Sequence, residues 1–377
     1  MDVVAMTREL VAFDSVSRKS NRPIAERIGA WLAADGFEVE TLTYRDENGM
    51  EKVSVVGRKG PGEGGLALIS HSDTVPADEY EGDPLSGEVR EGRLHGRGSC
   101  DMKGPLAATI AAAARFQPED LERPVLVIVT ADEETTGAGA TQVAQQSQLL
   151  KGTRYAVIAE PTRLVPVYAH KGGVRMDVVA RGRAAHSSTG EGISANFRIA
   201  PFLAEMAALA ERFQTEERYL NRAFDPPTNG WNMVIDDGQT ASNVTAAKSV
   251  CTLSFRPTPG HPTQEIIDRV RERAAYYGLE FAVRGHDAYS VSPDSPVVQA
   301  ALALTGTRAP GTVSYGTDAV RFPQLEMVVL GPGDIRQAHT VNEWIELDQL
   351  HTAVDVYSGL IRHFCEDSSQ TPDAGRQ

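Results

Sequence analysis

The feature that most constrains the fold is a short apolar run that ends in acids. Residues 125–129, VLVIV, have the character of a buried strand, and the chain passes from them almost directly into Asp132, Glu133 and Glu134. Two adjacent carboxylates about 5 Å apart repel by about 3 kcal/mol at an effective dielectric of about 20. These acids must therefore contact a compensating group or open water. We assign Asp132 only to the turn.

Strand-like and helical periods alternate through the first half of the chain, which favours an α/β sheet covered by helices. We expect strands at residues 37–44, 53–57, 66–70, 125–130 and 155–159. We expect helices up to residue 17 and at residues 23–35, 103–116 and 137–150. A helix at 295–305, a strand at 326–330 and a helix at 347–364 would complete this layered α/β domain.

The segment that begins near residue 174 has a different character. Strands near 174 and at 231–235, 249–255 and 279–284 alternate with helices at 196–213 and 263–277, as in a small α+β module. Two domains also suit the length, because 377 residues exceed the size at which a single core usually stops growing. We therefore place a discontinuous first domain at residues 1–172 and 287–377, and an inserted domain at 173–286.

Charge and cysteine content limit the partners and the compartment. The chain carries 37 Lys and Arg residues against 51 Asp and Glu residues, with no basic cluster, which argues against a nucleic-acid partner. Cys100, Cys251 and Cys365 are scattered, as in a reduced cytosolic protein. The first ten residues lack the pattern of a secretory signal, and the apolar stretch 107–114 is too short to span a bilayer. We expect a soluble cytoplasmic protein with no membrane partner and a frayed tail at 366–377.

Two glycine-rich stretches do not support a dinucleotide site. GPGEGG at 60–65 precedes an expected strand rather than a helix, and GRGSCDMKG at 96–104 has Asp101 where the third glycine of the fingerprint belongs. Both are interpreted as loops.

Polar residues with ligand chemistry follow several of the expected strands. His71 and Asp73 follow one, Glu160 another, and His339 comes after a glycine turn, while Asp101 opens a helix. Ligands bind outside the carboxyl ends of strands in α/β sheets, so these residues can converge. Taken singly, His71 could be a core histidine, Asp101 a helix cap, Glu160 part of a solvated turn and His339 a loop residue. Their recurrence at strand ends favours a shared site.

His71, Asp101, Glu134, Glu160 and His339 together have the chemistry of a metal site. Two imidazoles and three carboxylates suit zinc or a similar divalent ion, and five ligands are too many for one tetrahedral site. Two divalent ions bridged by one carboxylate fit, because their positive charges balance the negative charges of the three carboxylates and a bridging hydroxide. Glu133 is then left over as a candidate base.

Six motifs resemble a known family in order and over nearly the whole chain. They are SHSDTVP, GRGSCDMKG, TADEET, AEPT, RGRAAHSS and GPGDIRQAH followed by NEWI. They are similar to those of the di-zinc amidohydrolases and exopeptidases, which include acetylornithine deacetylase, succinyl-diaminopimelate desuccinylase, aminoacylase and glutamate carboxypeptidase. The resemblance implies a catalytic α/β domain with a central, mostly parallel sheet and an inserted α+β lid domain through which many members form homodimers.

The resemblance also implies roles for the candidate residues. His71 and Glu160 would bind one metal, Glu134 and His339 the other, and Asp101 would bridge them. The ions would be zinc, with cobalt as the alternative. Further roles follow for two acids outside the ligand set: Asp73 would orient the His71 imidazole, and Glu133 would be the general base that activates water. The Asp101-Met102 peptide would be cis.

Four residues outside the metal set complete the site that the resemblance implies. His186 would steady the oxyanion, typically in the active site of the other subunit, and Asn243 and Arg256 would contact the substrate from the lid. Thr317, with its neighbours Gly316 and Asp318, would lie beside the substrate carboxylate. An exposed histidine, a turn asparagine and a strand-end arginine are the alternative interpretations of the three lid residues.

Within the family, LVPVYAHKGG, TADEETTGAGA and SFRPTPG are most similar to the acetylornithine deacetylases. This similarity implies hydrolysis of N-acetyl-L-ornithine to L-ornithine and acetate, a step of arginine biosynthesis. Ser70 and the single Gly238 depart from common family residues, so a desuccinylase, a general N-acyl amino acid hydrolase and a carboxypeptidase or dipeptidase remain alternatives. A catalytically silent, metal-stabilised binding protein is the alternative of another class, and the presence of Glu133 argues against it.

Overall fold

The computed structural model describes residues 2–366, in two compact units. Unit 1 comprises the chain up to residue 168, residues 291–311 and the chain from residue 317, while unit 2 comprises residues 169–290 and 312–316. All of the expected tail except Glu366 lies outside the described residues.

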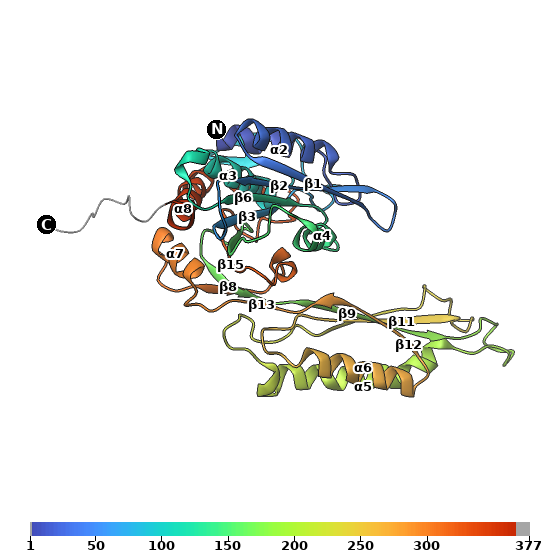
Figure 1. Cartoon of the computed structure of the whole chain (residues 1–377). Coiled ribbons are helices and arrows are strands. Elements are labelled where there is room, and N and C mark those ends of the chain that lie inside the picture. The colour runs from blue at the N-terminus through green and yellow to red at the C-terminus, as the bar shows by residue number, and fades with distance from the viewer. Residues whose placement is uncertain (1, 367–377) are drawn as a thin grey trace. The chain divides into compact units, whose positions relative to one another are not determined.

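The core of unit 1 is a mixed sheet whose four central strands are parallel (Figure 1). In order across the sheet they are β6 (Val125–Thr130), β3 (Leu66–His71), β7 (Tyr155–Ile158) and β15 (Glu326–Val329). On the β6 side the sheet continues antiparallel through β2 (Glu51–Lys59) and β1 (Glu38–Arg45). Beyond β15 the order continues with β8 (Val167–His170) and β13 (Tyr289–Ser290), and β14 (Gly311–Val313) pairs with β8.

The parallel centre explains the apolar runs in the sequence. All six residues of β3 and of β6 are buried, as is usual for parallel strands covered on both faces. The carboxyl ends of these strands meet at one edge of the sheet, which is where ligands bind in such folds. The α/β class and the parallel centre expected from the sequence are confirmed.

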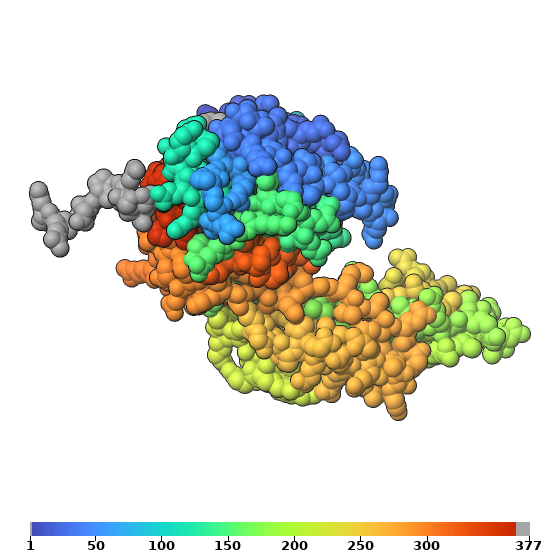
Figure 2. Space-filling model, in the orientation of Figure 1, coloured from blue at the N-terminus to red at the C-terminus, as the bar shows by residue number. Residues whose placement is uncertain are grey.

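Helices from both ends of the chain pack around this sheet. α1 (Val3–Val11), α2 (Arg22–Ala34), α3 (Gly104–Ala113), α7 (Pro296–Thr305) and α8 (Leu347–Cys365) share one hydrophobic core with it. In Figure 2, orange and red atoms from the C-terminal part of unit 1 lie against green atoms from its middle. α3 is buried on all sides, which explains its uniformly apolar sequence, and no described helix is long and apolar enough to cross a membrane.

Two parts of unit 1 differ from the sequence-based expectation. α1 ends at Val11 rather than near residue 17, because the segment that follows bonds to the loop after β3: the Ser15 hydroxyl donates to the Ser72 carbonyl at 2.7 Å. The second difference is a small sheet of three-residue strands, too short to show a period in the sequence. These strands are β4 (Glu88–Arg90), β5 (Arg93–His95) and β16 (Trp344–Glu346).

Unit 2 is a four-stranded antiparallel sheet with two helices. The strand order is β10 (Asn232–Asp236), β11 (Lys248–Phe255), β9 (Gly173–Arg181) and β12 (Glu280–His286). Alternate residues of β9 are buried, and they share a core with α5 (Ala195–Thr215) and α6 (Thr263–Tyr276). Unit 2 therefore has a hydrophobic core of its own.

Two helical glycines offer a matched test of the packing next to the acidic strand end. A Cβ on Gly139, in α4 (Ala138–Gln146), would lie 2.4 Å from the Ala131 carbonyl oxygen, whereas a Cβ on Gly29, in α2, would have 3.9 Å to its nearest neighbour. We expect Gly139→Ala to lower the free energy of unfolding by about 1 to 3 kcal/mol through overpacking. Gly29→Ala should raise it by up to about 1 kcal/mol, since alanine favours helix. Urea unfolding of both variants measures the difference, and equal stabilisation by both would contradict the close packing at Gly139.

Candidate metal centre

The five predicted ligands lie where the parallel strands end. His71 is the last residue of β3, Glu134 is in the turn after β6, and Glu160 follows β7. His339 lies in the loop that follows β15, and Asp101 is in the buried turn Ser99–Lys103. The Asp101-Met102 peptide in this turn is cis.

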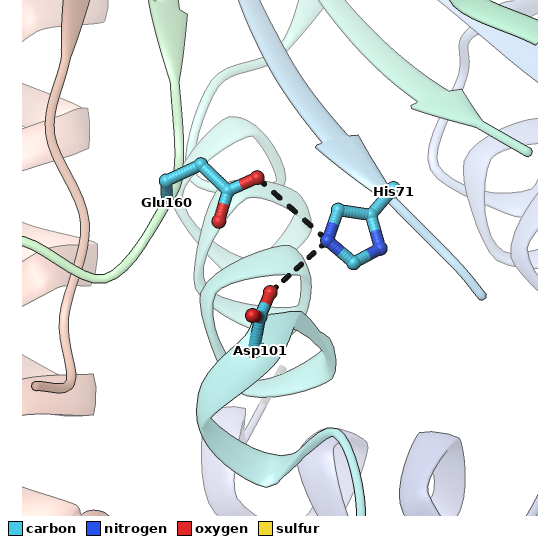
Figure 3. Close-up of side chains that lie close together, drawn as sticks. All are labelled: His71, Asp101 and Glu160. Carbon is cyan, nitrogen blue, oxygen red and sulfur yellow. Dashed lines mark hydrogen bonds and ion pairs between the residues drawn. The ribbon is translucent and has the colours of Figure 1, made fainter. Parts of the chain in front are cut away.

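Asp101 belongs to two groups of potential ligands. His71 Nε2 lies 3.1 Å from Asp101 Oδ1 and 3.7 Å from Glu160 Oε1 (Figure 3). On the other side, His339 Nε2 lies 3.2 Å from Asp101 Oδ2 and 3.1 Å from Glu134 Oε2. Within each group the potential ligand atoms all lie within 4.8 Å of one another. The two oxygens of Asp101 therefore face different groups, which is the arrangement that a bridging carboxylate requires.

The charges of this cluster fit two cations. The side chains of Asp101, Glu134 and Glu160 are only 8%, 7% and 6% exposed, and within residues 2–366 no lysine or arginine forms an ion pair with them. Buried charges are costly unless they are paired or bind metal. Imidazole and carboxylate donors are those that zinc and related divalent ions take. The residues thus fit two divalent ions sharing Asp101.

The pKa values show how strongly negative this environment is. Burial raises the pKa of Glu160 well above its ordinary value. Burial alone would lower the pKa of His71, but the hydrogen bond to Asp101 and the nearby Glu160 outweigh it and raise that pKa well above the usual range. Hydrogen bonds to Asp101 and Glu134 raise the pKa of His339 to about 10. Metal binding at such a site would release these protons, since ligands bind in their deprotonated forms.

Asp73 joins the end of β3 to the acidic turn after β6. His71 Nδ1 lies 3.0 Å from the main-chain oxygen of Asp73 and 3.6 Å from its carboxylate, so the carbonyl makes the closer contact. The carboxylate itself accepts the Ser17 hydroxyl at 2.6 Å and the backbone N–H groups of Glu133 and Glu134 at 3.2 and 3.4 Å. Asp73 therefore contacts the candidate ligand His71 and also holds the backbone of both glutamates.

Asp132 has more contacts than its assignment to the turn implied. Its side chain is buried, with Lys52 Nζ at 2.9 Å and the Tyr44 hydroxyl donating at 2.6 Å. Its backbone has φ of 61°, a left-handed conformation, and its carbonyl accepts the N–H groups of Thr136 and Gly137 at 3.0 and 2.7 Å. A buried lysine thus compensates one of the three adjacent acids and fixes the sharp turn that carries the other two.

Glu133, the candidate base, lies beside the ligands without belonging to either group. It is partly buried, and burial raises its pKa well above the ordinary value, with the charge of Glu160 adding to the effect. A carboxylate whose pKa is raised accepts a proton more readily than an ordinary one, as a general base must.

Two further buried acids lie near the candidate ligands. Glu343, which the sequence did not assign a role, is fully buried and bonds to the turn that carries Asp101. Asp318, which the resemblance placed with Thr317 beside the substrate carboxylate, accepts the Thr130 hydroxyl at 2.7 Å, and burial raises its pKa to about 6. The only sequence signal for Glu343 was its place in the NEWI motif. Thr317 is buried, and its hydroxyl accepts the N–H of Ala319 at 3.1 Å, so it caps the turn that positions Asp318.

The three predicted lid residues belong to unit 2, and two of them are adjacent. His186 is exposed, forms a β-bridge with Val244, and its Nδ1 lies 2.7 Å from the Ser188 hydroxyl. Asn243 is also exposed, and its carbonyl accepts the N–H of Ser187 at 2.9 Å. Arg256 follows β11 with an exposed side chain, and its N–H donates to the Asn229 carbonyl at 2.6 Å.

Known proteins with similar sequences cover almost the whole chain. Acetylornithine deacetylase of Myxococcus xanthus is 36% identical over 375 residues, which are 96% of this chain and 97% of that protein. Acetylornithine deacetylase of Proteus mirabilis (strain HI4320) is 32% identical over 380 residues and covers 96% of each chain.

Solved structures share the fold. An M20 family metallo-carboxypeptidase from Sulfolobus solfataricus has a TM-score of 0.74 at 17% identity, covering 96% of this chain and 99% of its own. A dinuclear metal-binding M20 peptidase from Bacillus subtilis has a TM-score of 0.64 at 16% identity, covering 95% and 96%. The model of peptidase family M20/M25/M40 matches residues 67–363, which confirms the resemblance drawn from the six motifs. The chain therefore belongs to this family of metal-dependent hydrolases.

Proposed function

We propose that this hydrolase cleaves the amide bond of N-acetyl-L-ornithine, releasing L-ornithine and acetate. The main support for this reaction is the pair of candidate ligand groups that share Asp101. Glu133 lies beside them and belongs to neither group. The choice of substrate is supported by the curated relatives, which are named acetylornithine deacetylase and match the chain over nearly its full length. On this proposal the protein works in the cytoplasm, in arginine biosynthesis.

Two zinc ions, or cobalt in their place, would be held by the five clustered residues. His71 and Glu160 would hold one ion, Glu134 and His339 the other, and Asp101 both. Bound divalent ions lower the pKa of water and polarise a carbonyl group. Asp73 contributes by contacting His71 Nδ1, which keeps Nε2 directed at the ligand group.

Glu133 would move the proton in both halves of the reaction. It takes a proton from the attacking water as the carbon–oxygen bond forms, and returns it to the leaving amine as the carbon–nitrogen bond breaks. The backbone of Glu133 is held by Asp73, so its carboxylate stays beside the neighbouring ligand Glu134. Burial supports this role, since it raises the pKa of Glu133 and so makes its carboxylate a better proton acceptor.

Residues of unit 2 would contact the substrate and a second copy of the chain. In this proposal His186 stabilises the oxyanion, Asn243 and Arg256 bind the substrate, and Thr317 contributes from unit 1. Exposed apolar side chains on unit 2 support a homodimer, because apolar surface of this kind favours a protein partner. They are Phe197, Val234 and Ile235, which are 83%, 54% and 53% exposed.

Hydrolysis of a substrate panel after metal removal tests the proposed reaction. We expect the protein to cleave N-acetyl-L-ornithine with a higher kcat/KM than other N-acetyl amino acids, succinyl-diaminopimelate or dipeptides. Stripping the metal with a chelator should abolish the activity, and zinc or cobalt should restore it. Preference for succinyl-diaminopimelate or for a dipeptide would replace the proposed substrate, and full activity in metal-free protein would reject the metal mechanism.

Variants of the two adjacent glutamates test the division of labour in the acidic turn. Glu133→Gln should lower kcat by about 100-fold to 10,000-fold, since it removes the general base, while the bound metal stays near the wild-type amount. Glu134→Gln should lose metal, because it removes a ligand. Elemental analysis of both proteins beside their kinetics measures this, and equal metal loss in both variants would contradict the assignment.

Mixed dimers test whether His186 acts across subunits. His186→Ala and Glu133→Gln are each expected to be nearly inactive as homodimers. If His186 serves the partner's site, heterodimers of the two variants contain one site with both wild-type residues and should regain up to about half of the activity per dimer. Heterodimers isolated with two different tags provide the measurement, and no recovery in them would place His186 in its own subunit's site.

A further inference from the structure

The Glu343 carboxylate is the common acceptor for the turn that carries Asp101. It is fully buried, and its Oε1 accepts the backbone N–H groups of Cys100 and Asp101, each at 2.9 Å. Its Oε2 accepts the N–H of Gly98 at 3.0 Å and the Arg97 guanidinium at 2.8 Å. One carboxylate therefore accepts four hydrogen bonds, three of them from backbone N–H groups within the turn or directly before it.

These backbone bonds bear directly on where the Asp101 side chain points. The N–H of Asp101 itself is one of the donors, and the backbone angles of Asp101 depart from helical values. A buried N–H without an acceptor is unfavourable by about 1 to 3 kcal/mol, so the turn keeps this conformation only while an acceptor is present. Glu343 therefore holds the backbone from which both oxygens of Asp101 reach the two ligand groups.

Glu343 is itself held in place from several directions. Its carbonyl accepts the N–H of Gly96 at 3.0 Å and the hydroxyl of Tyr80 at 3.0 Å. It lies at the end of the short segment 339–343, which begins with His339, one of the two histidines that contact the Asp101 carboxylate. The loop that supplies His339 thus also supplies the acceptor for the Asp101 turn.

We propose that Glu343 is the positioning residue of this centre, acting through Asp101 to set the relative placement of the two metal sites. This inference rests on the proposed two-ion function. Pairing with Arg97 alone does not account for Glu343, because Arg97 supplies only one of its four hydrogen bonds. Glu343 forms no part of either ligand group, so its effect on the metals must pass through the turn.

The test compares zinc retention by holoenzyme variants challenged with increasing chelator. Glu343→Gln keeps the size of the side chain, but its NH₂ group would face N–H donors on one side of the turn. We expect it to lose zinc at about 10-fold to 100-fold lower chelator concentration, as is typical for residues that orient metal ligands. Its kcat should fall with KM nearly unchanged, since Glu343 does not touch the substrate.

Glu346→Gln is the matched control. Glu346 lies close by in sequence, and its carboxylate accepts a hydrogen bond from the Gln349 side chain. Within the described residues it forms no hydrogen bond with the Asp101 turn. This variant should retain zinc as the wild type does. Glu343→Asp is a second variant that preserves the negative charge beside Arg97 while withdrawing the carboxylate by about 1.5 Å, one bond length. It should show the same direction of change as Glu343→Gln.

The outcomes separate positioning from general stability. The proposal would be overturned if Glu343→Gln melted at a lower temperature than the wild type but retained zinc and kcat at wild-type levels. Glu343 would then have a structural role only. If neither Glu343 variant folds, the positioning role is likewise rejected. A wild-type enzyme that holds two zinc ions but hydrolyses no N-acyl amino acid would refute the proposed substrate, while the zinc comparison would still decide the role of Glu343.

Discussion

Repulsion among buried carboxylates is the constraint that organises unit 1 around its strand ends. Two acids outside the ligand set have partners from the chain: Lys52 and Tyr44 for Asp132, and backbone N–H groups with the Ser17 hydroxyl for Asp73. Asp101, Glu134 and Glu160 have no lysine or arginine partner within the described residues, and their ion-pair partners are the histidines His71 and His339. Pairing some of the acids within the chain leaves the remaining negative charge concentrated where divalent ions would bind.

The sequence predicted the sheet centre and the convergence of the five candidate residues because both follow from local signals. A continuous apolar run such as residues 125–130 has few alternatives to a buried parallel strand, and β6 has these bounds. Residues directly after such strands must lie at one edge of the sheet, so His71 and Glu160 could be brought together although they are far apart in sequence. Their recurrence at strand ends favoured a shared metal site, although each residue alone had an ordinary interpretation, and the assignment of each to one ion rested on the family resemblance.

The supporting contacts could not be predicted because their partners are distant in the chain and carry no local pattern. Tyr44 and Lys52 in the first two strands reach Asp132, and Glu343 reaches backbone atoms near residue 100. A buried lysine in a strand looks like a surface lysine until its partner is known. The backbone N–H groups that Glu343 satisfies leave no trace in side-chain identity, and the end of α1 at Val11 likewise depends on bonds to the loop after β3.

The discontinuity of unit 1 has a consequence for synthesis on the ribosome. The turn with Asp101 is made early, but its acceptor Glu343 and its neighbour His339 emerge only after all of unit 2. Ribosomes add about 5 to 20 residues per second, and domains tend to fold as units during this synthesis. Unit 2 can therefore form its own core while the acids of unit 1 still await their last partners. Glu343 follows Asp101 by 242 residues in the chain, so the Asp101 turn can gain its acceptor only when synthesis is nearly finished.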